Sequence, residues 1–192
     1  MNIKSIISCL AFSAASIALA PATIGAAQAA DGEACSTIRF SDVGWTDITA
    51  TTATTSVIAK ALGYDADVKV LSVPVTYTSL ANNDIDVFLG NWMPTMEADI
   101  RPYLDAGTVA STGVNLEGAK YTLATNAKGA EMGIKTFADI AANKDALGGK
   151  IYGIEPGNDG NRLILDMIEK DAFGLTGFEV VESSEAGMLA QV

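Results

Sequence analysis

Histidine is absent from this chain of 192 residues, and cysteine occurs only twice. The lack of histidine excludes Ser-His-Asp triads, histidine-ligated zinc and imidazole acid/base chemistry. No GxGxxG sequence opens a helix and no GxxxxGK sequence occurs, so nucleotide binding has no support. Paired carboxylates are present, but no spacing among them singles out a glycosidase couple. We therefore expect a protein that is not an enzyme and needs no cofactor or metal.

Basic residues are also scarce, with 12 Lys and Arg against 23 Asp and Glu and a net charge of −11. This balance argues against nucleic acid as a partner. The acidic charge suits free diffusion in an envelope compartment, and it also suits a cationic ligand. Charge alone does not choose between these two interpretations.

The longest apolar run lies at the N-terminus, where Lys4 is the only charge and the run extends over residues 6–20. Small residues follow the run, which is short for a membrane span. This pattern predicts a signal peptide over residues 1–30, cleaved after Ala29 or Ala30, and therefore export to the periplasm. An uncleaved membrane anchor is the alternative.

Two further observations predict that the sequence is part of a longer protein. Removal of residues 1–30 leaves Cys35 without an intrachain partner, which is an odd count for an oxidising compartment. The final segment, residues 184–192, begins a helical pattern that no glycine, proline or lysine-rich turn closes.

Short β-branched runs alternate with amphipathic stretches from Thr37 onward, which predicts an α/β fold of parallel βαβ units. We expect two lobes, residues 31–119 and an incomplete lobe over residues 120–192. Strands are predicted at 37–40, 68–73, 85–89, 121–125, 150–154 and 179–182. Helices are predicted at 48–62, 77–82, 94–107, 134–147 and 162–173, with Val57, Ile58, Ala61 and Leu62 on one apolar face of the first helix.

The only two tryptophans, Trp45 and Trp92, each follow the end of a predicted strand. In open α/β sheets, ligands bind beyond the carboxyl ends of the strands. Tryptophan offers the best π-face for a cation, and several such faces hold a quaternary ammonium, which has no N–H to donate. The pair therefore predicts a site for such a cation, with packing in the hydrophobic core as the alternative.

Three polar or aromatic residues are further candidates. Asp47 lies at the start of the first helix, where it suits an N-cap and also a counter-charge beside Trp45. Tyr121 suits either packing or the site. Asn158, within the turn-forming stretch 155–161, suits helix capping and equally a hydroxyl ligand, to which it offers a donor and an acceptor.

The motifs that surround these residues carry a resemblance: Phe-Ser-Asp-Val-Gly-Trp45-Thr-Asp47, Leu-Gly-Asn-Trp92-Met-Pro, Ala-Lys-Tyr121 and Gly-Ile-Glu-Pro-Gly-Asn158-Asp. From about Cys35 to its last residue, the chain resembles the periplasmic choline-binding proteins of ABC importers, relatives of the glycine betaine binders. The resemblance implies a two-lobed periplasmic binding protein fold, type II-like, with parallel-rich sheets flanked by helices.

The resemblance also implies roles for the candidates. Trp45, Trp92 and Tyr121 would form three walls of an aromatic box around trimethylammonium, Asp47 would supply negative charge and Asn158 would contact the hydroxyl end. The family extends beyond the end of this chain, where it brings a further box tryptophan and a cysteine that would pair with Cys35.

The expected function is that of a monomeric receptor, which captures choline and delivers it to an ABC transporter permease in the inner membrane. Glycine betaine or another quaternary ammonium is the nearest alternative ligand. An exported choline-ester hydrolase and a sensor ectodomain are the alternatives from other classes.

Overall fold

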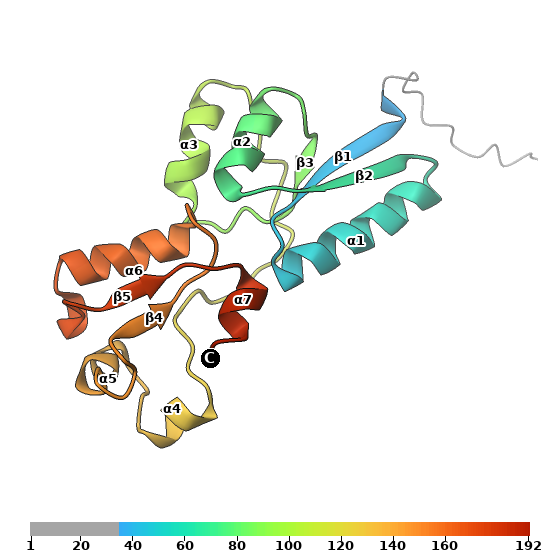
Figure 1. The fold of residues 1–192 in the computed structure, drawn as a ribbon. Helices are drawn as coiled ribbons and strands as arrows, with labels where there is room; N and C mark the ends of the chain where they lie inside the picture. Colours follow the sequence, from blue (N-terminus) through green and yellow to red (C-terminus); the bar gives the residue numbers. More distant parts are fainter. Residues whose placement is uncertain (1–34) are drawn as a thin grey trace, which may run out of the picture. The chain divides into compact units, whose positions relative to one another are not determined.

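The computed structural model describes residues 35–192, which form two parallel β-sheets with helices around them (Figure 1). The predicted signal peptide, residues 1–30, lies outside the described residues. Within residues 35–192, none of the helices combines the length and the apolar character needed to cross a membrane. Cys35, the first described residue, is exposed and forms no disulfide.

The first sheet has three strands in the order β2-β1-β3, all parallel. Each of its first two strands is followed by a helix, as the predicted βαβ units require. The elements are β1 (Thr37–Asp42), α1 (Thr46–Ala61), β2 (Asp65–Val70), α2 (Val73–Ala81), β3 (Val87–Phe88) and α3 (Glu97–Asp105).

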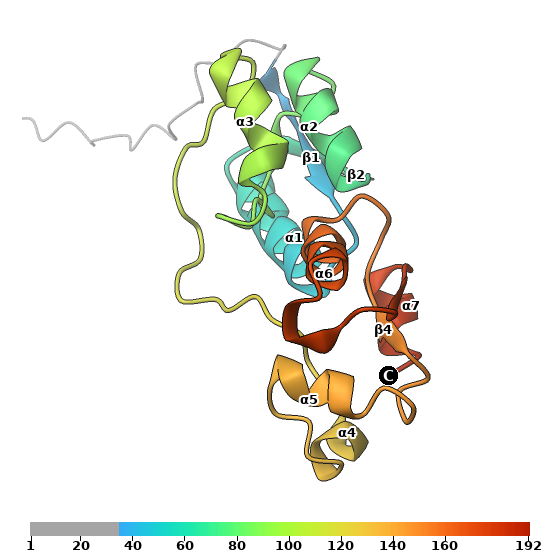
Figure 2. The ribbon, with the colours of Figure 1, turned by 90° about the vertical axis from the view of Figure 1, so that its left-hand side faces the viewer.

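The second sheet consists of the parallel strands β4 and β5. A long segment between α3 and α4, without helix or strand, leads into this part of the chain (Figure 2). The elements are α4 (Ala127–Glu131), α5 (Phe137–Ala142), β4 (Lys150–Tyr152), α6 (Asp159–Glu169), a 3₁₀ turn (Ala172–Gly174), β5 (Glu179–Val181) and α7 (Glu185–Leu189).

These elements confirm the predicted α/β class and the parallel pairing, but the strand predicted at residues 121–125 is wrong. A strand needs a partner for its backbone N–H and C=O groups. In the part of the chain that the structure describes, neither sheet includes these residues. The helix predicted at 134–147 is also too long, because a capping box of Thr136 and Asp139 begins α5 at Phe137.

The apolar face predicted for the first helix does not pack into the core. Val57, Ile58 and Leu62 are exposed. The helix instead buries Ile48, Thr52, Ser56 and Ala59, which repeat at the spacing of one helical face. Helix α1 packs against β1 and β2, so beyond Ile48 its buried face consists of the small or polar side chains of Thr52, Ser56 and Ala59.

Two hydrophobic clusters fill the described region. One, called cluster 1, is built around the first sheet and contains Val43, Trp45, Ile48, Val73, Tyr77, Met96 and Ile100, with Trp92 packed against it. The other, cluster 2, is built around the second sheet and contains Ile134, Ile140, Ile151, Ile164, Leu175 and Phe178. Trp45 and Trp92, the two tryptophans predicted to line a ligand site, therefore lie in or against the same cluster.

A buried hydroxyl pair ties β1 to α2 and provides a test of the packing. Ser41 and Thr76 are fully buried, and their hydroxyl groups bond at 2.6 Å. Thr76→Val leaves the Ser41 hydroxyl without this partner, so we expect the free energy of unfolding to fall by about 1–3 kcal/mol. Urea denaturation of the full-length protein measures this change.

The matched control is Thr54→Val in α1, where an exposed threonine bonds only to the backbone of its own helix. This change should stay within about 0.5 kcal/mol of the wild type. Equal losses in the two variants would contradict the role given to the buried pair.

Candidate functional site

A tight turn between β1 and α1 positions Trp45. The Asp42 carboxylate accepts hydrogen bonds from the Gly44 backbone N–H at 2.8 Å and from the Thr49 hydroxyl at 2.7 Å. Gly44 has a φ of +80°, a left-handed conformation that suits glycine. The side chain of Trp45 is only 7% exposed, and its indole Nε1 donates to both carboxylate oxygens of Glu155 at 3.1 and 3.0 Å.

The start of α1 differs from the prediction for Asp47. The N-cap residue is Trp45, so the N-cap interpretation of Asp47 is wrong. Glu185, from the start of α7, takes over the capping: it accepts bonds from the Thr46 N–H at 3.0 Å and from the Thr46 hydroxyl at 2.7 Å. Asp47 lies exposed in the first turn of α1, where a negative charge suits the positive end of the helix dipole.

Trp92 and Tyr121 form an aromatic pair. Their ring centroids are 5.8 Å apart and their planes are inclined by 36°. The backbone N–H of Trp92 donates to the sulfur of Met96, a fully buried residue of cluster 1. Tyr121 comes from the long segment before α4 and keeps 46% of its surface exposed. The ring contact thus connects Trp92, which packs against cluster 1, to the segment between α3 and α4 that contains Tyr121.

Asn158 is the N-cap of α6 and is 1% exposed, so the capping interpretation is confirmed. Its amide oxygen accepts from the Gly160 N–H at 2.7 Å and from the Tyr121 hydroxyl at 3.2 Å. Its amide nitrogen donates to Glu155 at 3.1 Å. Asn158 therefore caps α6 and at the same time holds the Tyr121 hydroxyl in place.

Glu155 connects these residues, and sequence reasoning treated it only as part of a turn. Its carboxylate receives the indole N–H of Trp45 and the side-chain amide of Asn158. The available signal was its place directly after a strand, in the same position relative to β4 that Trp45 has relative to β1. An acidic residue at a strand end beside a turn motif marks a candidate ligand contact.

The five predicted site residues do not all meet. Four of them, Trp45, Trp92, Tyr121 and Asn158, form one connected set, in which Glu155 and the ring pair supply the links. No hydrogen bond or ring contact in the described part of the chain attaches the Asp47 side chain to this set.

Acidic side chains act on Tyr121, one residue of this set, and on Tyr77 in cluster 1. Burial, followed by the charges of Asp159 and Glu155, raises the pKa of Tyr121 to about 12. Burial, followed by the charges of Asp99 and Asp159, also raises the pKa of Tyr77 above its ordinary range. Carboxylates near aromatic rings provide an environment that favours a cation.

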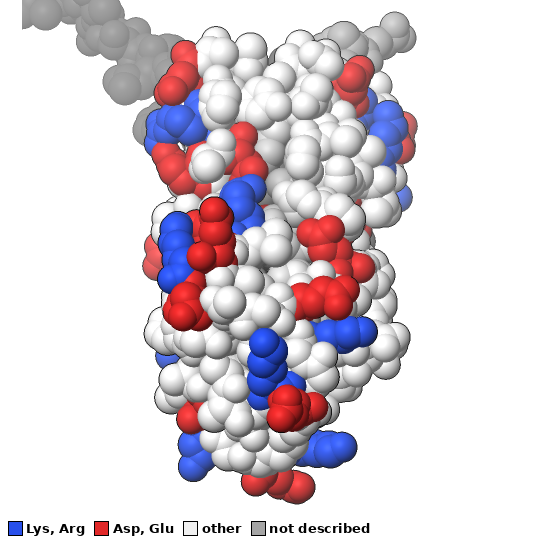
Figure 3. All heavy atoms as spheres, turned by 60° about the vertical axis from the view of Figure 1, so that its left-hand side comes forward, with Lys and Arg blue, Asp and Glu red and all other residues white. Residues whose placement is uncertain are grey.

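Basic residues do not form a continuous surface on the face drawn in Figure 3. There, most Lys and Arg side chains lie beside Asp or Glu side chains. In the described residues, the Arg162 guanidinium likewise bonds to Asp99 at 3.2 and 2.7 Å. Nucleic acid binding needs an exposed basic surface, so this face does not support it.

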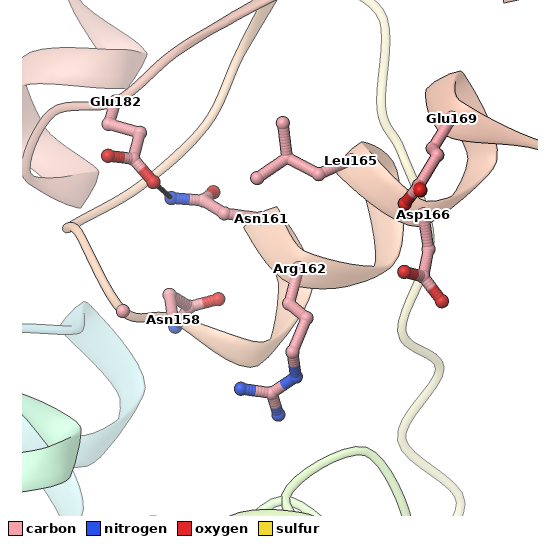
Figure 4. A pocket seen from close by; sticks show the side chains of 8 residues that line it. Asn158, Asn161, Arg162, Leu165, Asp166, Glu169 and Glu182 are labelled. Atoms are coloured by element: carbon pink, nitrogen blue, oxygen red, sulfur yellow. Dashed lines mark hydrogen bonds between the residues drawn. The ribbon is translucent and has the colours of Figure 1, made fainter.

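A cavity of about 230 Å³ adjoins Asn158 but differs in character from the aromatic set. Polar and charged side chains of α6, together with Glu182, line most of it (Figure 4). The Asn161 amide donates to Glu182 at 3.1 Å, and in Figure 4 the Arg162 guanidinium points away from both. None of Trp45, Trp92 and Tyr121 lines this cavity.

Parallel sheets flanked by helices, with aromatic and acidic side chains after the strand ends, place these side chains where open α/β folds bind small ligands. A family model of the substrate-binding domain of ABC-type glycine betaine transport systems, OpuAC, matches residues 36–192. The chain belongs to this family.

Individual relatives agree with the family. A solved ABC-transporter choline binding protein in complex with choline is 76% identical, with a TM-score of 0.80, over 84% of this chain and 56% of that chain. An ABC-transporter choline binding protein in an unliganded semi-closed conformation is 77% identical, with a TM-score of 0.73, over 83% of this chain and 55% of that chain.

An uncharacterized protein, ORF1, of Chromohalobacter salexigens is 50% identical over 129 residues, which are 67% of this chain and 83% of that protein. The chain spans only a little over half the length of the two solved choline binding proteins.

Gly160 provides a test of the geometry around Tyr121. A Cβ on Gly160 would lie 2.1 Å from the Tyr121 hydroxyl oxygen. Gly160→Ala should therefore lower the free energy of unfolding by about 1–3 kcal/mol through overpacking, although alanine is the better helix former by about 1 kcal/mol. Urea denaturation measures the loss, and near-ultraviolet circular dichroism reports the displaced aromatic pair.

The matched control is Gly113→Ala, because a Cβ there meets no atom within 4 Å. It should leave both measurements at their wild-type values. A Gly160→Ala variant as stable as the wild type, with an unchanged aromatic spectrum, would show that the close approach is wrong.

Proposed function

We propose that the protein captures choline in the periplasm and delivers it to an ABC transporter permease in the inner membrane. The observation that supports this best is a chain of contacts among three aromatic residues: Glu155 accepts from Trp45 and Asn158, Asn158 accepts from Tyr121, and the Tyr121 ring lies 5.8 Å from that of Trp92. Aromatic faces and negative charge together suit a quaternary ammonium, which offers positive charge without an N–H donor.

In this proposal Trp45, Trp92 and Tyr121 are three walls of an aromatic box around the trimethylammonium group. Each cation–π contact contributes about 0.5–2 kcal/mol, depending on how far the cation is desolvated. Asp47 adds negative charge at the start of α1, and Asn158 contacts the hydroxyl end of the ligand. The box draws residues from three separate stretches of the chain, so it forms only in the folded protein.

The proposed mechanism needs two lobes, residues 31–119 and 120–192, that close on the ligand. Separate sheets with their own hydrophobic clusters support this division. Ligand binding would shift the population towards the closed form, which would then dock on the permease. We also propose that the protein is exported through a signal peptide over residues 1–30 and that it acts as a monomer.

Glycine betaine is the alternative ligand, and the family description favours it. A betaine carries a carboxylate in addition to its trimethylammonium group. Glu155 and Asp159 raise the pKa of Tyr121 through their charges, so both act on the neighbourhood of the aromatic pair. Like charges repel at short range, so this pattern supports choline over betaine.

The aromatic box predicts a large loss of affinity when an indole is removed. Trp92→Ala should raise the Kd for choline at least about tenfold, because one or more cation–π contacts are lost. Trp45→Phe should weaken binding less, since it keeps a ring in the core and loses the bond to Glu155. Isothermal titration calorimetry on the full-length protein measures both constants.

Phe173→Ala is the control, because Phe173 is an exposed aromatic residue that packs on Phe137. It should bind choline as the wild type does. Unchanged choline affinity in Trp92→Ala would overturn the box.

Glu155 predicts the direction of ligand selectivity. Glu155→Gln preserves the size of the side chain and removes its charge, so the Kd for choline should rise about tenfold while the Kd for glycine betaine stays constant or falls. Competition calorimetry with the two ligands gives the ratio. The same substitution at the exposed Glu179 in β5 should leave that ratio unchanged. An equal loss for both ligands in Glu155→Gln would refute the electrostatic explanation.

A further inference from the structure

The hydroxyl group of Tyr77 lies in cluster 1, and the proposed binding mechanism does not use it. Tyr77 is the largest of the fully buried side chains in the described residues, with 1% of its surface exposed. Burial, followed by the charges of Asp99 and Asp159, raises its pKa above the ordinary range, so the hydroxyl keeps its proton. A buried hydroxyl that stays protonated is a donor, and its acceptor shows which part of the chain it holds.

The acceptor of this hydroxyl is Asn91, the residue before Trp92. Tyr77 donates to the side-chain oxygen of Asn91 at 2.7 Å. The same hydroxyl oxygen lies 3.9 Å from the sulfur of Met96, which accepts the backbone N–H of Trp92 at 3.1 Å. One hydroxyl group of α2 therefore contacts both the side chain that precedes Trp92 and the side chain that binds its N–H.

Other contacts anchor the turn that carries Trp92. The Trp92 carbonyl oxygen accepts from the Thr95 hydroxyl at 2.9 Å and from the Met96 N–H at 3.0 Å. A Cβ on Gly90 would lie 2.9 Å from a side-chain carbon of Ile48, so the backbone before the turn packs closely against α1. The turn is thus anchored at the end of β3 and at the start of α3, and the hydroxyl from α2 anchors it from a third element.

The ring of Tyr77 is itself held by two aromatic neighbours. Phe88 meets it edge to face, with ring centroids 5.9 Å apart, and Tyr103 stacks on it at 6.0 Å. Tyr103 belongs to α3, which lies beside α2 (Figure 1). A donor whose ring is fixed by packing holds its acceptor more closely than a mobile donor does.

We infer that the Tyr77 hydroxyl is a positioning group for Trp92, which it holds in the orientation that the trimethylammonium group of the ligand requires. This inference rests on the proposed function. In this role Tyr77 does not touch the ligand, and it acts through Asn91 and Met96 on the backbone of Trp92. The Trp92 ring lies 5.8 Å from the Tyr121 ring, so a displaced turn would move one wall of the box against its neighbour. A wall that is in place before the ligand arrives costs less ordering on binding.

The test is the affinity of Tyr77→Phe for choline, because this change removes the hydroxyl and keeps the packed ring. Isothermal titration calorimetry on the full-length protein, at a temperature where every variant is folded, should give a Kd about three- to tenfold above the wild-type value, since Trp92 then becomes ordered only on binding. The tryptophan band of the near-ultraviolet circular dichroism spectrum should also change in the unliganded variant.

Asn91→Ala is the second variant, because it removes the acceptor of the same hydrogen bond. It should raise the Kd for choline by a similar factor. This variant carries the test if Tyr77→Phe does not fold.

Two controls separate positioning from a general loss of stability. Tyr103→Phe makes the same chemical change in the stacked ring, whose hydroxyl pairs with that of Thr78 at 3.1 Å. Thr76→Val removes a buried hydroxyl one position earlier in α2, where it bonds to Ser41. Both controls should keep the wild-type Kd and the wild-type tryptophan band. A rise in Kd for Thr76→Val equal to that for Tyr77→Phe would show that lost stability explains the effect, and would overturn the inference.

A double variant shows whether Tyr77 acts through Trp92. Once the indole is removed in Trp92→Ala, adding Tyr77→Phe should leave the Kd for choline unchanged, because the effects of coupled residues are not additive. The same relative rise with and without the indole would refute the positioning role.

The outcomes distinguish this inference from the proposed function. If the wild type does not bind choline, the proposed function fails and the inference fails with it. If the wild type binds choline and Trp92→Ala binds it weakly, but Tyr77→Phe and Asn91→Ala both bind it as the wild type does, the aromatic box stands and the role of Tyr77 is wrong.

Discussion

The carboxylate of Glu155 is the constraint on which the described site depends. It accepts the indole N–H of Trp45, 110 positions earlier in the chain, and the side-chain amide of Asn158. Through Asn158 it also fixes the hydroxyl of Tyr121, whose ring contacts Trp92. Aromatic residues from three stretches of the chain are thereby linked, with Trp45 bonded to Glu155 directly and Tyr121 through Asn158. A hydrophobic cluster alone would bring the rings together without fixing their orientation.

Acidic groups near Tyr121 carry a cost that a cationic ligand would offset under the proposed function. The charges of Asp159 and Glu155 both raise the pKa of Tyr121, and the burial of an acidic group such as Asp159 without a paired cation is unfavourable. Arg162, the basic residue nearest to Asp159 in sequence, is bound to Asp99. A ligand that binds the folded state and supplies positive charge stabilises that state by mass action. Under the proposed function, binding of a cation would therefore offset the cost of these acidic residues.

The alternation of strands and helices and the parallel pairing could be predicted from the sequence, because the β-branched runs and glycine stops are local signals. The strand predicted at residues 121–125 could not be corrected from sequence, since pairing depends on distant partners. The buried face of α1 was also missed, because residues such as Thr52 and Ser56 look like a solvated face until the sheet covers them. Segment boundaries shifted wherever a capping interaction, such as that of Thr136 and Asp139, decided the first residue.

The candidate site also divides into residues that local sequence signals reveal and residues that only distant contacts reveal. Trp45, Trp92, Tyr121 and Asn158 could be selected because their residue types suit a quaternary ammonium and their motifs carry the resemblance. Glu155 was missed although its place after a strand was a signal, and Asp159 could not be selected, because its burial without a hydrogen-bond partner among the described residues shows only in the fold. The N-cap prediction for Asp47 rested on its place at the start of the predicted helix. The distant Glu185 caps the helix instead, which no local pattern reveals.

The most direct test of the central claim is a crystal structure of the full-length protein grown with choline. The account predicts that the choline nitrogen lies within about 6 Å of the ring centroids of Trp45, Trp92 and Tyr121. A choline molecule bound away from these three rings, or in the polar cavity along α6, would contradict it.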